Sequence, residues 1–360
     1  MEVAFELPIN PVSFGQVSTA LLREAYARGM SPSVFAIGNV DLSTQDTEDK
    51  DFLKWLEDRL NNSLKTHKKD FPSIKLWHIN GGLSSVSNEQ TLLTFYETDS
   101  PTQSELNITR QNKTVFTSTF TKQIFESNGV DCHYVPLGFD KYNFSKIEKK
   151  YFSDDRIVFN LCGKLEKRKH HKKVIQSWLN KFGDNGKYFL QCALFNPHIK
   201  QEDNIRLFNE CTGGREFFNL SFLNYMPHNS LYNDFLNSGD ISISMSGGEG
   251  WSLPEFHSVA LGKHAVVLNA HVYKDWANKD NAVLVNPSGK IECYDGMFFQ
   301  KGQQFNQGNL FDFEVDEFIA ACEEAIKRVE SNRLNEHGLK LQKDFTYSNT
   351  LEQLLSIAKE

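Results

Sequence analysis

This chain of 360 residues contains no run of about 18 apolar residues, the minimum for a membrane-spanning helix. The sequence therefore predicts no transmembrane segment. The N-terminus also lacks the basic start and apolar stretch of a secretory signal peptide, and its first apolar residues are typical of a strand instead. We therefore expect a cytoplasmic protein.

Cysteine is scarce, at six residues, and none forms a CxxC pair or has a metal-ligating neighbour at the spacing of a zinc site. Several of these cysteines lie within apolar runs, such as Cys162 in residues 158–162. Buried free thiols in a reducing compartment are the simplest interpretation. The sequence predicts neither a disulfide framework nor a bound metal.

Positive charge is also in the minority, because 39 Lys and Arg residues stand against 46 Asp and Glu residues, for a formal net charge of −7. An acidic balance of this kind does not favour binding to nucleic acid. Apolar residues make up 39% and charged residues 24%, as in ordinary globular proteins. The length is more than one hydrophobic core usually serves, and it suits two domains.

The sequence does contain a regular alternation of apolar strands and helical patterns. The strands predicted in the first half are residues 3–7, 34–37, 75–79, 92–96, 115–117 and 133–135. Those of the second half are residues 157–161, 188–192, 217–222, 241–245, 265–268 and 283–285. The helical patterns include residues 17–28, 52–64, 121–127, 174–182, 315–329 and 334–359. This alternation predicts an α/β protein with parallel sheets that carry helices on both faces.

The alternation is interrupted by a polar and lysine-rich stretch at residues 139–155, which we interpret as an interdomain linker. The sequence thus predicts a first Rossmann-like domain at residues 1–145 and a second at residues 155–332. The last helices, residues 333–360, are expected to pack back toward the first domain. Ligands of doubly wound sheets bind at the carboxyl ends of the strands, so we expect the site in a cleft between the domains.

Three loops that follow predicted strands carry candidate chemistry. The first surrounds Gly15 and Gln16, where a glycine lets the backbone approach a ligand closely. The helix that follows offers free N–H groups and the positive end of its dipole to an anion. An ordinary helix start is the alternative, since single glycines open many helices.

The second loop, residues 163–173, is strongly basic and contains Lys164, Arg168 and Lys169. A solvated charged turn is the ordinary interpretation of such a run. However, the helix dipole opposes cations at a helix N-terminus by about 0.3–1 kcal/mol each, and a bound anion would remove that conflict. We therefore favour an anion site, and a diphosphate fits because lysine is a good point-charge partner for phosphate.

The third loop, residues 246–257, begins with paired glycines that suit a close backbone approach to a ligand. Ser252 and Glu255 have the spacing of a capping box for the next helix, and Pro254 suits its first turn. Glu249 precedes this cap and has no such structural role. A carboxylate at that position is suited to accept hydrogen bonds from sugar hydroxyls.

Residues 246–254, Ser-Gly-Gly-Glu-Gly-Trp-Ser-Leu-Pro, followed by Ala-Leu-Gly-Lys at 260–263, resemble the signature of retaining GT-B glycosyltransferases, in particular family 4, also called group 1. Further segments resemble the family's motifs in the same order, namely residues 116–122 with 129–130, residues 135–140, and residues 162–164 with Lys169. The resemblance extends from about residue 14 to residue 285. Each motif alone is a weak signal, and the ordered set is the strong one.

The resemblance implies a GT-B fold, in which two Rossmann-like doubly wound domains face a central cleft. It implies a hexosyltransferase-like enzyme that moves a sugar from a UDP- or GDP-sugar to a hydroxyl acceptor, with retention of the anomeric configuration and without a metal or cofactor. By similarity, Lys164 and Lys169 neutralise the departing diphosphate and Glu249 contacts the transferred sugar. Lys164 stands where the family usually has arginine, and Arg168 is a candidate to replace that arginine.

The resemblance also assigns residues to the donor pocket. The candidates are Gly15, Gln16, Gly163, Arg168, Tyr225, Met226, Ser246, Gly247, Gly248, Gly250, Trp251 and His257. His271, in a loop after a later strand, is a further candidate. His257 departs from the family pattern, which has a second glutamate here to contact the ribose. A neutral imidazole accepts one hydrogen bond where a carboxylate accepts several, so this departure weakens the implied ribose recognition.

The first domain supplies candidates on the acceptor side. His78 ends a predicted strand near the place where the family carries a histidine close to the donor sugar, and Asn80 competes for that role. The alternative is a buried core histidine whose ring nitrogens are hydrogen-bonded within the protein. Glu97 and Asp99 end the next strand and are expected to orient the acceptor hydroxyl, with helix capping as the alternative. This pair also resembles an acidic metal site, which the family does not need.

The sequence leaves the acceptor open. A glycan, a lipid-linked glycan or another hydroxyl compound fits, while the acidic balance does not favour a nucleic-acid acceptor. Two other functions also stay open. A non-catalytic protein that binds sugar nucleotides fits the missing second glutamate, and a GT-B-like epimerase would act on the sugar nucleotide without an acceptor.

Overall fold

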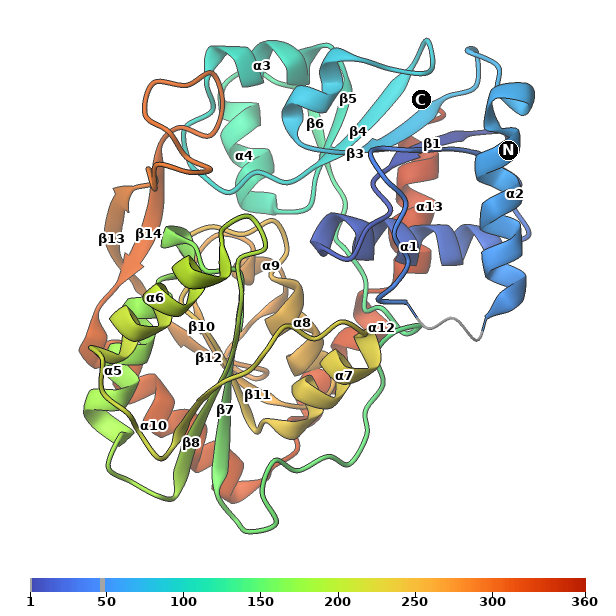
Figure 1. Ribbon diagram of the computed structural model, residues 1–360. Helices are drawn as coiled ribbons and strands as arrows, with labels where there is room; N and C mark the ends of the chain where they lie inside the picture. Colours follow the sequence, from blue (N-terminus) through green and yellow to red (C-terminus); the bar gives the residue numbers. More distant parts are fainter. Residues whose placement is uncertain (1, 46–48) are drawn as a thin grey trace.

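The computed structural model describes residues 2–45 and 49–360 of the chain. Figure 1 shows two α/β units, one above the other, each built on a six-stranded sheet, with a two-stranded hairpin at one side. All strand pairs of the two large sheets are parallel, as the alternation of strands and helices predicts. Within the described ranges, no helix is both long enough and apolar enough to cross a membrane.

The first unit has the strand order β2-β1-β3-β4-β5-β6. Its strands are β1 (Ala4–Leu7), β2 (Ser33–Ala36), β3 (Ser73–Leu76), β4 (Gln90–Thr94), β5 (Lys113–Phe116) and β6 (Cys132–Tyr134). Its helices are α1 (Ser13–Ala27), α2 (Lys50–Thr66), α3 (Gln103–Arg110) and α4 (Thr119–Ser127), with a short 3-10 helix η1 (Ile79–Leu83) after β3. The topology switches direction between β1 and β3, so the loops after these two strands border the same crevice.

The second unit has the strand order β12-β11-β10-β7-β8-β9. Its strands are β7 (Ile157–Gly163), β8 (Tyr188–Leu194), β9 (Leu220–Phe222), β10 (Ile241–Ser244), β11 (His264–Leu268) and β12 (Val283–Val285). Its helices are η2 (Lys167–Lys169), α5 (His171–Phe182), α6 (Gln201–Thr212), α7 (Asn229–Ser238), α8 (Leu253–Ala260), α9 (Tyr273–Trp276) and α10 (Val315–Ser331). The topology switches between β7 and β10, which places the second and third candidate loops side by side.

Apolar runs buried on both faces make the central strands of the second sheet, as expected for parallel strands. In β7, the ring of Phe159 packs against Trp178 at 5.7 Å and against Phe182 at 6.1 Å, both from α5. Fully burying a phenylalanine side chain stabilises a fold by about 1.5–3 kcal/mol. All six cysteines are free thiols, and all are buried except Cys162, which is half-buried.

Two predicted strands of the first unit end earlier than the sequence indicates. β3 ends at Leu76 and not at residue 79, and β4 ends at Thr94 and not at residue 96. Apolar residues continue beyond both ends because Trp77 and Phe95 pack on Phe14 of α1, with ring centroids 5.9 Å and 4.8 Å away. These aromatic side chains therefore belong to the loop region and not to the sheet.

The sequence patterns do not indicate the antiparallel hairpin of β13 (Pro287–Glu292) and β14 (Asn309–Phe313). It follows the second sheet but contacts the first unit, and Figure 1 shows its loop beside α3. The Nζ of Lys290 lies 2.7 Å from Asp99 Oδ2, and the N–H of Asn309 donates to Asp99 Oδ1 at 2.8 Å. The hairpin is thus a second connection between the units.

The predicted helix at residues 334–359 is three short helices, α11 (Glu336–Leu339), α12 (Leu341–Asp344) and α13 (Tyr347–Ile357). The backbone is extended at Phe345, and the Thr346 side chain then caps α13. α13 packs against α1, and the Oγ1 of Thr350 donates to the carbonyl of Pro136 at 2.7 Å. The chain thus ends on the first unit.

The connection between the sheets, residues 135–156, contains no helix or strand, as expected for the lysine-rich stretch. It is nevertheless packed, because Phe139 and Phe144 are buried. The N–H of Ser145 also donates to Asn233 Oδ1 of α7 at 3.1 Å. The linker is therefore fastened to the second unit.

Candidate functional site

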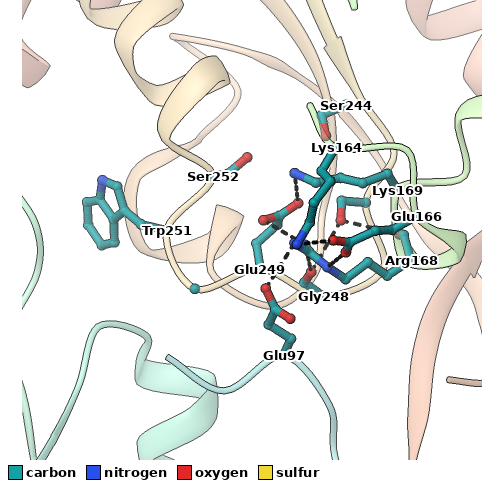
Figure 2. Close-up of polar contacts among 12 residues, drawn as sticks. Glu97, Lys164, Glu166, Arg168, Lys169, Ser244, Gly248, Glu249, Trp251 and Ser252 are labelled. Atoms are coloured by element: carbon teal, nitrogen blue, oxygen red, sulfur yellow. Dashed lines mark hydrogen bonds and ion pairs between the residues drawn. The ribbon is translucent and has the colours of Figure 1, made fainter. Parts of the chain in front are cut away.

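Arg168 is the centre of a charged cluster at the switch point of the second sheet (Figure 2). Its Nε lies 2.7 Å from Glu166 Oε2, and its Nη1 lies 2.9 Å from Glu249 Oε2 and 2.8 Å from the Gly248 carbonyl. Its Nη2 lies 3.0 Å from Glu97 Oε1 of the first unit. Each nitrogen of this guanidinium thus has an oxygen partner from the protein. The prediction that Arg168 replaces the family's phosphate-binding arginine stays a prediction, and in this arrangement its guanidinium binds protein oxygens.

Lys164 and Lys169 flank Arg168 on the same turn between β7 and α5. The ammonium of Lys169 is buried and pairs with Glu249 Oε1, while that of Lys164 pairs with Glu166 Oε1 and stays partly exposed. Burial, together with the charge of Arg168, lowers the pKa of Lys164 to about 8. The turn is possible because Gly163 has φ +134°, which side chains other than glycine rarely adopt.

Glu249 is only 5% exposed and lies between Arg168 and Lys169. Burial alone would raise the pKa of its carboxyl group, but the two cations outweigh burial and bring the pKa to about 2. Glu249 is therefore ionised across the physiological pH range. Glu249 thus lies in one cluster with Lys164 and Lys169, and the catalytic roles predicted for these three residues and for His78 stay predictions.

The glycines of the third loop make a close approach to protein, where the sequence predicts an approach to a ligand. A Cβ on Gly248 would lie 1.9 Å from the Glu97 carbonyl oxygen, and one on Gly247 would lie 2.3 Å from the Phe311 carbonyl oxygen. A Cβ on Gly250 would meet Phe95 at 2.8 Å. The loop is thus covered by the segment that follows β4 and by β14, and the predicted approach of these glycines to a ligand stays a prediction.

Ser246 is also enclosed within this loop. It is fully buried, and its hydroxyl donates to the carbonyl of Gly248 at 3.2 Å and lies 3.3 Å from the carbonyl of Arg168. Its observed partners are therefore backbone groups of the two candidate loops. Ser246 holds the loops together at the switch point.

Gly15 and Gln16 likewise contact protein. A Cβ on Gly15 would lie 1.9 Å from the carbonyl oxygen of Asn10, so the loop that precedes α1 itself requires a glycine here. The amides of Gln16 and Asn229 exchange two hydrogen bonds, of 3.1 and 3.0 Å, across the two units. The structure therefore uses Gln16 to join α1 to α7.

Trp251 and His257 have packing partners outside the cluster. Figure 2 shows Trp251 directed to the opposite side of its loop, and its ring packs on Phe256 at 5.3 Å. His257 is buried 4.5 Å from Phe144, and its Nε2 accepts the Asp140 N–H at 3.4 Å. Burial lowers the pKa of His257 to about 3, so the imidazole is neutral. Both residues make packing contacts here, and the donor-binding roles assigned to them stay predictions.

The predicted capping box of α8 is wrong, although Pro254 does lie in its first turn. Ser252 has φ +62°, and its hydroxyl donates to the Glu255 carboxylate and not to a backbone N–H. Tyr273 completes this buried network, because its hydroxyl lies 2.7 Å from Ser244 and 3.0 Å from Ser252. Burial raises the pKa of Glu255 to about 7.

Four other candidates are more accessible. His78 is exposed, with Phe14 at 4.7 Å and Trp77 at 5.5 Å, and desolvation by the surrounding protein lowers its pKa although Glu97 opposes this effect. Asn80 is exposed at the start of η1. The remaining two follow β9: Tyr225 is 52% exposed with its ring 5.7 Å from that of Phe195, and Met226 is half-buried. The sequence left open that His78 is a core histidine with its hydrogen bonds satisfied, and its exposure excludes this alternative.

Glu97 and Asp99 have different partners. Glu97 pairs with Arg168, while Asp99 binds Lys290 and the N–H of Asn309. Burial would raise the pKa of Asp99, but these hydrogen bonds lower it overall. Neither residue caps α3, whose capping box is Thr102 with Glu105. Asp99 thus anchors the hairpin, and the acceptor-side role predicted for it stays a prediction.

His271 is buried with φ +50°, an uncommon conformation for a residue other than glycine. Its ring lies 4.7 Å from that of Phe120, and burial lowers its pKa to about 4. Among the residues that the structure describes, no group of three or more His, Cys, Asp or Glu side chains is arranged to hold a metal ion.

Sequence reasoning missed Glu166. Its side chain is only 3% exposed, although it lies in the basic loop and bonds both Lys164 and Arg168. The signal was present, because Glu166 is the only acidic residue of residues 163–173. The net charge of the loop is positive and does not indicate the ion pairs that this single carboxylate forms.

No protein-family model and no curated protein sequence matches the chain. Solved structures do match along the full length. A sucrose-phosphate synthase from Thermosynechococcus elongatus has 10% identity and a TM-score of 0.68, with 100% of this chain and 98% of that chain covered. A glycosyltransferase from Rickettsia africae has 11% identity and a TM-score of 0.68, with 99% and 97% covered.

HepE from Anabaena, solved in complex with UDP-glucose, has 12% identity and a TM-score of 0.65, with 100% of this chain and 99% of that chain covered. Identities this low establish the architecture and not the activity. The strand orders, the two facing switch points and these likenesses agree with the fold that the sequence motifs implied. The chain has the GT-B fold of these glycosyltransferases.

Proposed function

We propose that this protein is a glycosyltransferase that moves a sugar from a nucleotide-sugar donor to a hydroxyl acceptor. The observation that carries the proposal is the convergence of Lys164, Lys169 and Glu249 at the β7/β10 switch point of a GT-B fold. A UDP- or GDP-sugar is the proposed donor. The likeness to HepE, which was solved with UDP-glucose bound, supports a UDP-sugar.

In the proposed reaction, Lys164 and Lys169 stabilise the charge that develops on the departing diphosphate. Fixed charges aimed at a developing charge usually make the largest contribution to catalysis. The N-terminus of α5 adds the positive end of its dipole at the same place. Glu249 accepts a hydrogen bond from a hydroxyl of the transferred sugar, exchanging it for its contact with Lys169.

We further propose retention of the anomeric configuration. The departing phosphate oxygen takes the proton of the acceptor hydroxyl on the same face of the sugar, so no separate general base is required. The configuration of the product, read by NMR, tests this step, and an inverted product contradicts it. Because two ammonium groups provide the positive charge, we propose that the reaction proceeds equally well in the presence of EDTA.

Donor entry requires the two units to separate locally. The backbone of Gly248 is in contact with the Glu97 carbonyl, which leaves no space for a ligand between these loops. We propose that the units open at this contact to admit the donor and close over it, which excludes water and aligns the acceptor. The acceptor, a glycan, a lipid-linked glycan or another hydroxyl compound, then meets His78 and Asn80.

We propose a cytoplasmic location.

A second candidate is a non-catalytic protein that binds sugar nucleotides. The observation that favours it is the burial of His257 against Phe144, at the position where the family has its second glutamate. This candidate predicts that a sugar nucleotide stabilises the protein without being cleaved.

The test is a panel of sugar nucleotides in a thermal-shift assay, followed by an assay for release of free nucleotide from the best ligand. Glu249→Ala and Lys169→Ala are compared with the wild type, and Glu210→Ala, an exposed carboxylate of the same unit, is the control. Slow nucleotide release that is lost in the first two variants supports the transferase. Stabilisation without release supports the second candidate, and no stabilisation by any sugar nucleotide overturns both.

A further inference from the structure

Glu166 is a carboxylate placed inside the cation cluster by the same turn that carries the cations. One oxygen pairs with Lys164 and the other lies 2.7 Å from Arg168 Nε. Its side chain is 3% exposed, less than that of either partner. Glu166 therefore does not exchange its partners for water, as an exposed carboxylate on a basic surface would.

The cluster balances its own charge before any ligand arrives. Lys164, Arg168 and Lys169 supply three positive charges, and three carboxylates are joined to them by direct ion pairs. These carboxylates are Glu97, Glu166 and Glu249. A nucleoside diphosphate therefore meets six groups whose formal charges cancel, and not three free cations.

The three carboxylates differ in what happens to them when a donor binds. Glu97 belongs to the first unit and moves away when the units separate, and Glu249 is proposed to turn to the sugar. Glu166 alone shares a turn with Lys164 and Arg168, so it remains beside them in every state. In the proposed reaction it stays in contact with Lys164, one of the two cations that stabilise the diphosphate.

We infer that Glu166 is a built-in counter-anion that lowers the affinity of the donor site for nucleoside diphosphates and so speeds the release of the nucleotide product. This inference rests on the proposed function. Glu166 is a positioning residue in this scheme, because it acts through Lys164 and Arg168 and does not touch the substrate. Its charge acts only on charged ligands, which separates this role from a merely structural one.

The test is calorimetric titration of UDP, GDP and the matching uncharged nucleosides into wild type, Glu166→Gln and Glu210→Gln. The control removes an exposed carboxylate that pairs with Lys172 of the same unit, so both variants change the net charge equally. Removing a unit negative charge a few ångströms from a diphosphate should tighten its binding by about tenfold or more. Glu166→Gln is expected to show this gain for the diphosphate and none for the nucleoside, while the control shows neither.

A second variant covers the case in which Glu166→Gln leaves Lys164 unpaired and unfolds the protein. The double variant Lys164→Gln with Glu166→Gln removes both members of the ion pair, and its diphosphate affinity should stay within about threefold of the wild type. A tenfold loss in the double variant overturns the inference, because Lys164 would then act as a free cation. Equal diphosphate affinity of wild type and Glu166→Gln also overturns it. If no nucleotide binds to any of these proteins, the proposed function fails as well.

Discussion

Arg168 of the second unit and Glu97 of the first form an ion pair of 3.0 Å, at the same point where the Glu97 carbonyl touches Gly248. The two units therefore meet through the residues that build the charged cluster. Because Arg168 also holds Glu249 and Glu166, we expect separation of the units to remove one of its three ion pairs and to leave the other two. Substitution of any of these residues should therefore change contacts both at the interface and in the cluster.

Replacing Glu97 should loosen the closed arrangement. In Glu97→Gln the charge that attracts Arg168 across the interface is lost, while the size of the side chain is kept. Small-angle scattering should then report a larger radius of gyration than in the wild type. Glu126→Gln is the matched control, because Glu126 pairs with Lys122 within its own helix. Identical scattering of Glu97→Gln and wild type would show that other contacts alone keep the units closed.

Replacing Glu249 should cost stability as well as activity. Glu249→Ala leaves Lys169 without its carboxylate in a buried position, and breaking a buried ion pair costs about 3–5 kcal/mol. Urea unfolding at pH 7 should show a loss near the lower figure, since Arg168 keeps two other carboxylates. Inorganic phosphate should restore part of the loss by replacing the anion. In the exposed control Glu292→Ala, the expected loss is below about 1 kcal/mol.

The affinity for a nucleoside diphosphate should fall in alkaline solution. The pKa of Lys164 is lowered to about 8 by burial and by Arg168, so its positive charge is lost as the pH rises through this value. Titrations of UDP or GDP between pH 7 and pH 10 should show weaker binding at each step above about 8. In Lys164→Arg, whose guanidinium keeps its charge, the affinity should stay level. A fall of equal size in both proteins would assign the titration to another group.

The stability contributed by Glu255 should depend on pH with a defined sign. Burial raises the pKa of Glu255 from 4.5 in the unfolded chain to about 7 in the folded protein, so the folded state holds the extra proton between these values. The wild type therefore loses stability from this group as the pH rises from 4.5 through 7, by about 3 kcal/mol at most.

Glu255→Gln cannot lose a proton and should not show this loss. The free energy of unfolding of both proteins is measured in urea from pH 4.5 to pH 8. The value for the variant minus that for the wild type should increase as the pH rises. The control Glu292→Gln removes an exposed carboxylate, and its difference from wild type should be flat. A difference that moves in favour of the wild type with rising pH would contradict the buried, protonated state of Glu255.

Those features of this protein that depend on local patterns can be predicted from the order of its residues alone. Apolar runs such as residues 157–161 favour buried strands, and their alternation with helical patterns predicts the two doubly wound parallel sheets that are observed. The same order places residues 163–169 and 246–250 after adjacent strands, β7 and β10, so the meeting of Lys169 with Glu249 was predictable.

The groups that these residues bind depend on how distant segments pack in the folded protein. Arg168 meets Glu97 because two separate sheets pack together, and Gly248 is a glycine because the Glu97 carbonyl comes against it. The hairpin of β13 and β14 covers the same loop, although no local pattern indicates it. The periodicity of apolar residues predicts which face of each helix or strand is buried, one element at a time. The partners of a buried charge come from distant segments, and the packing of whole units brings these segments together.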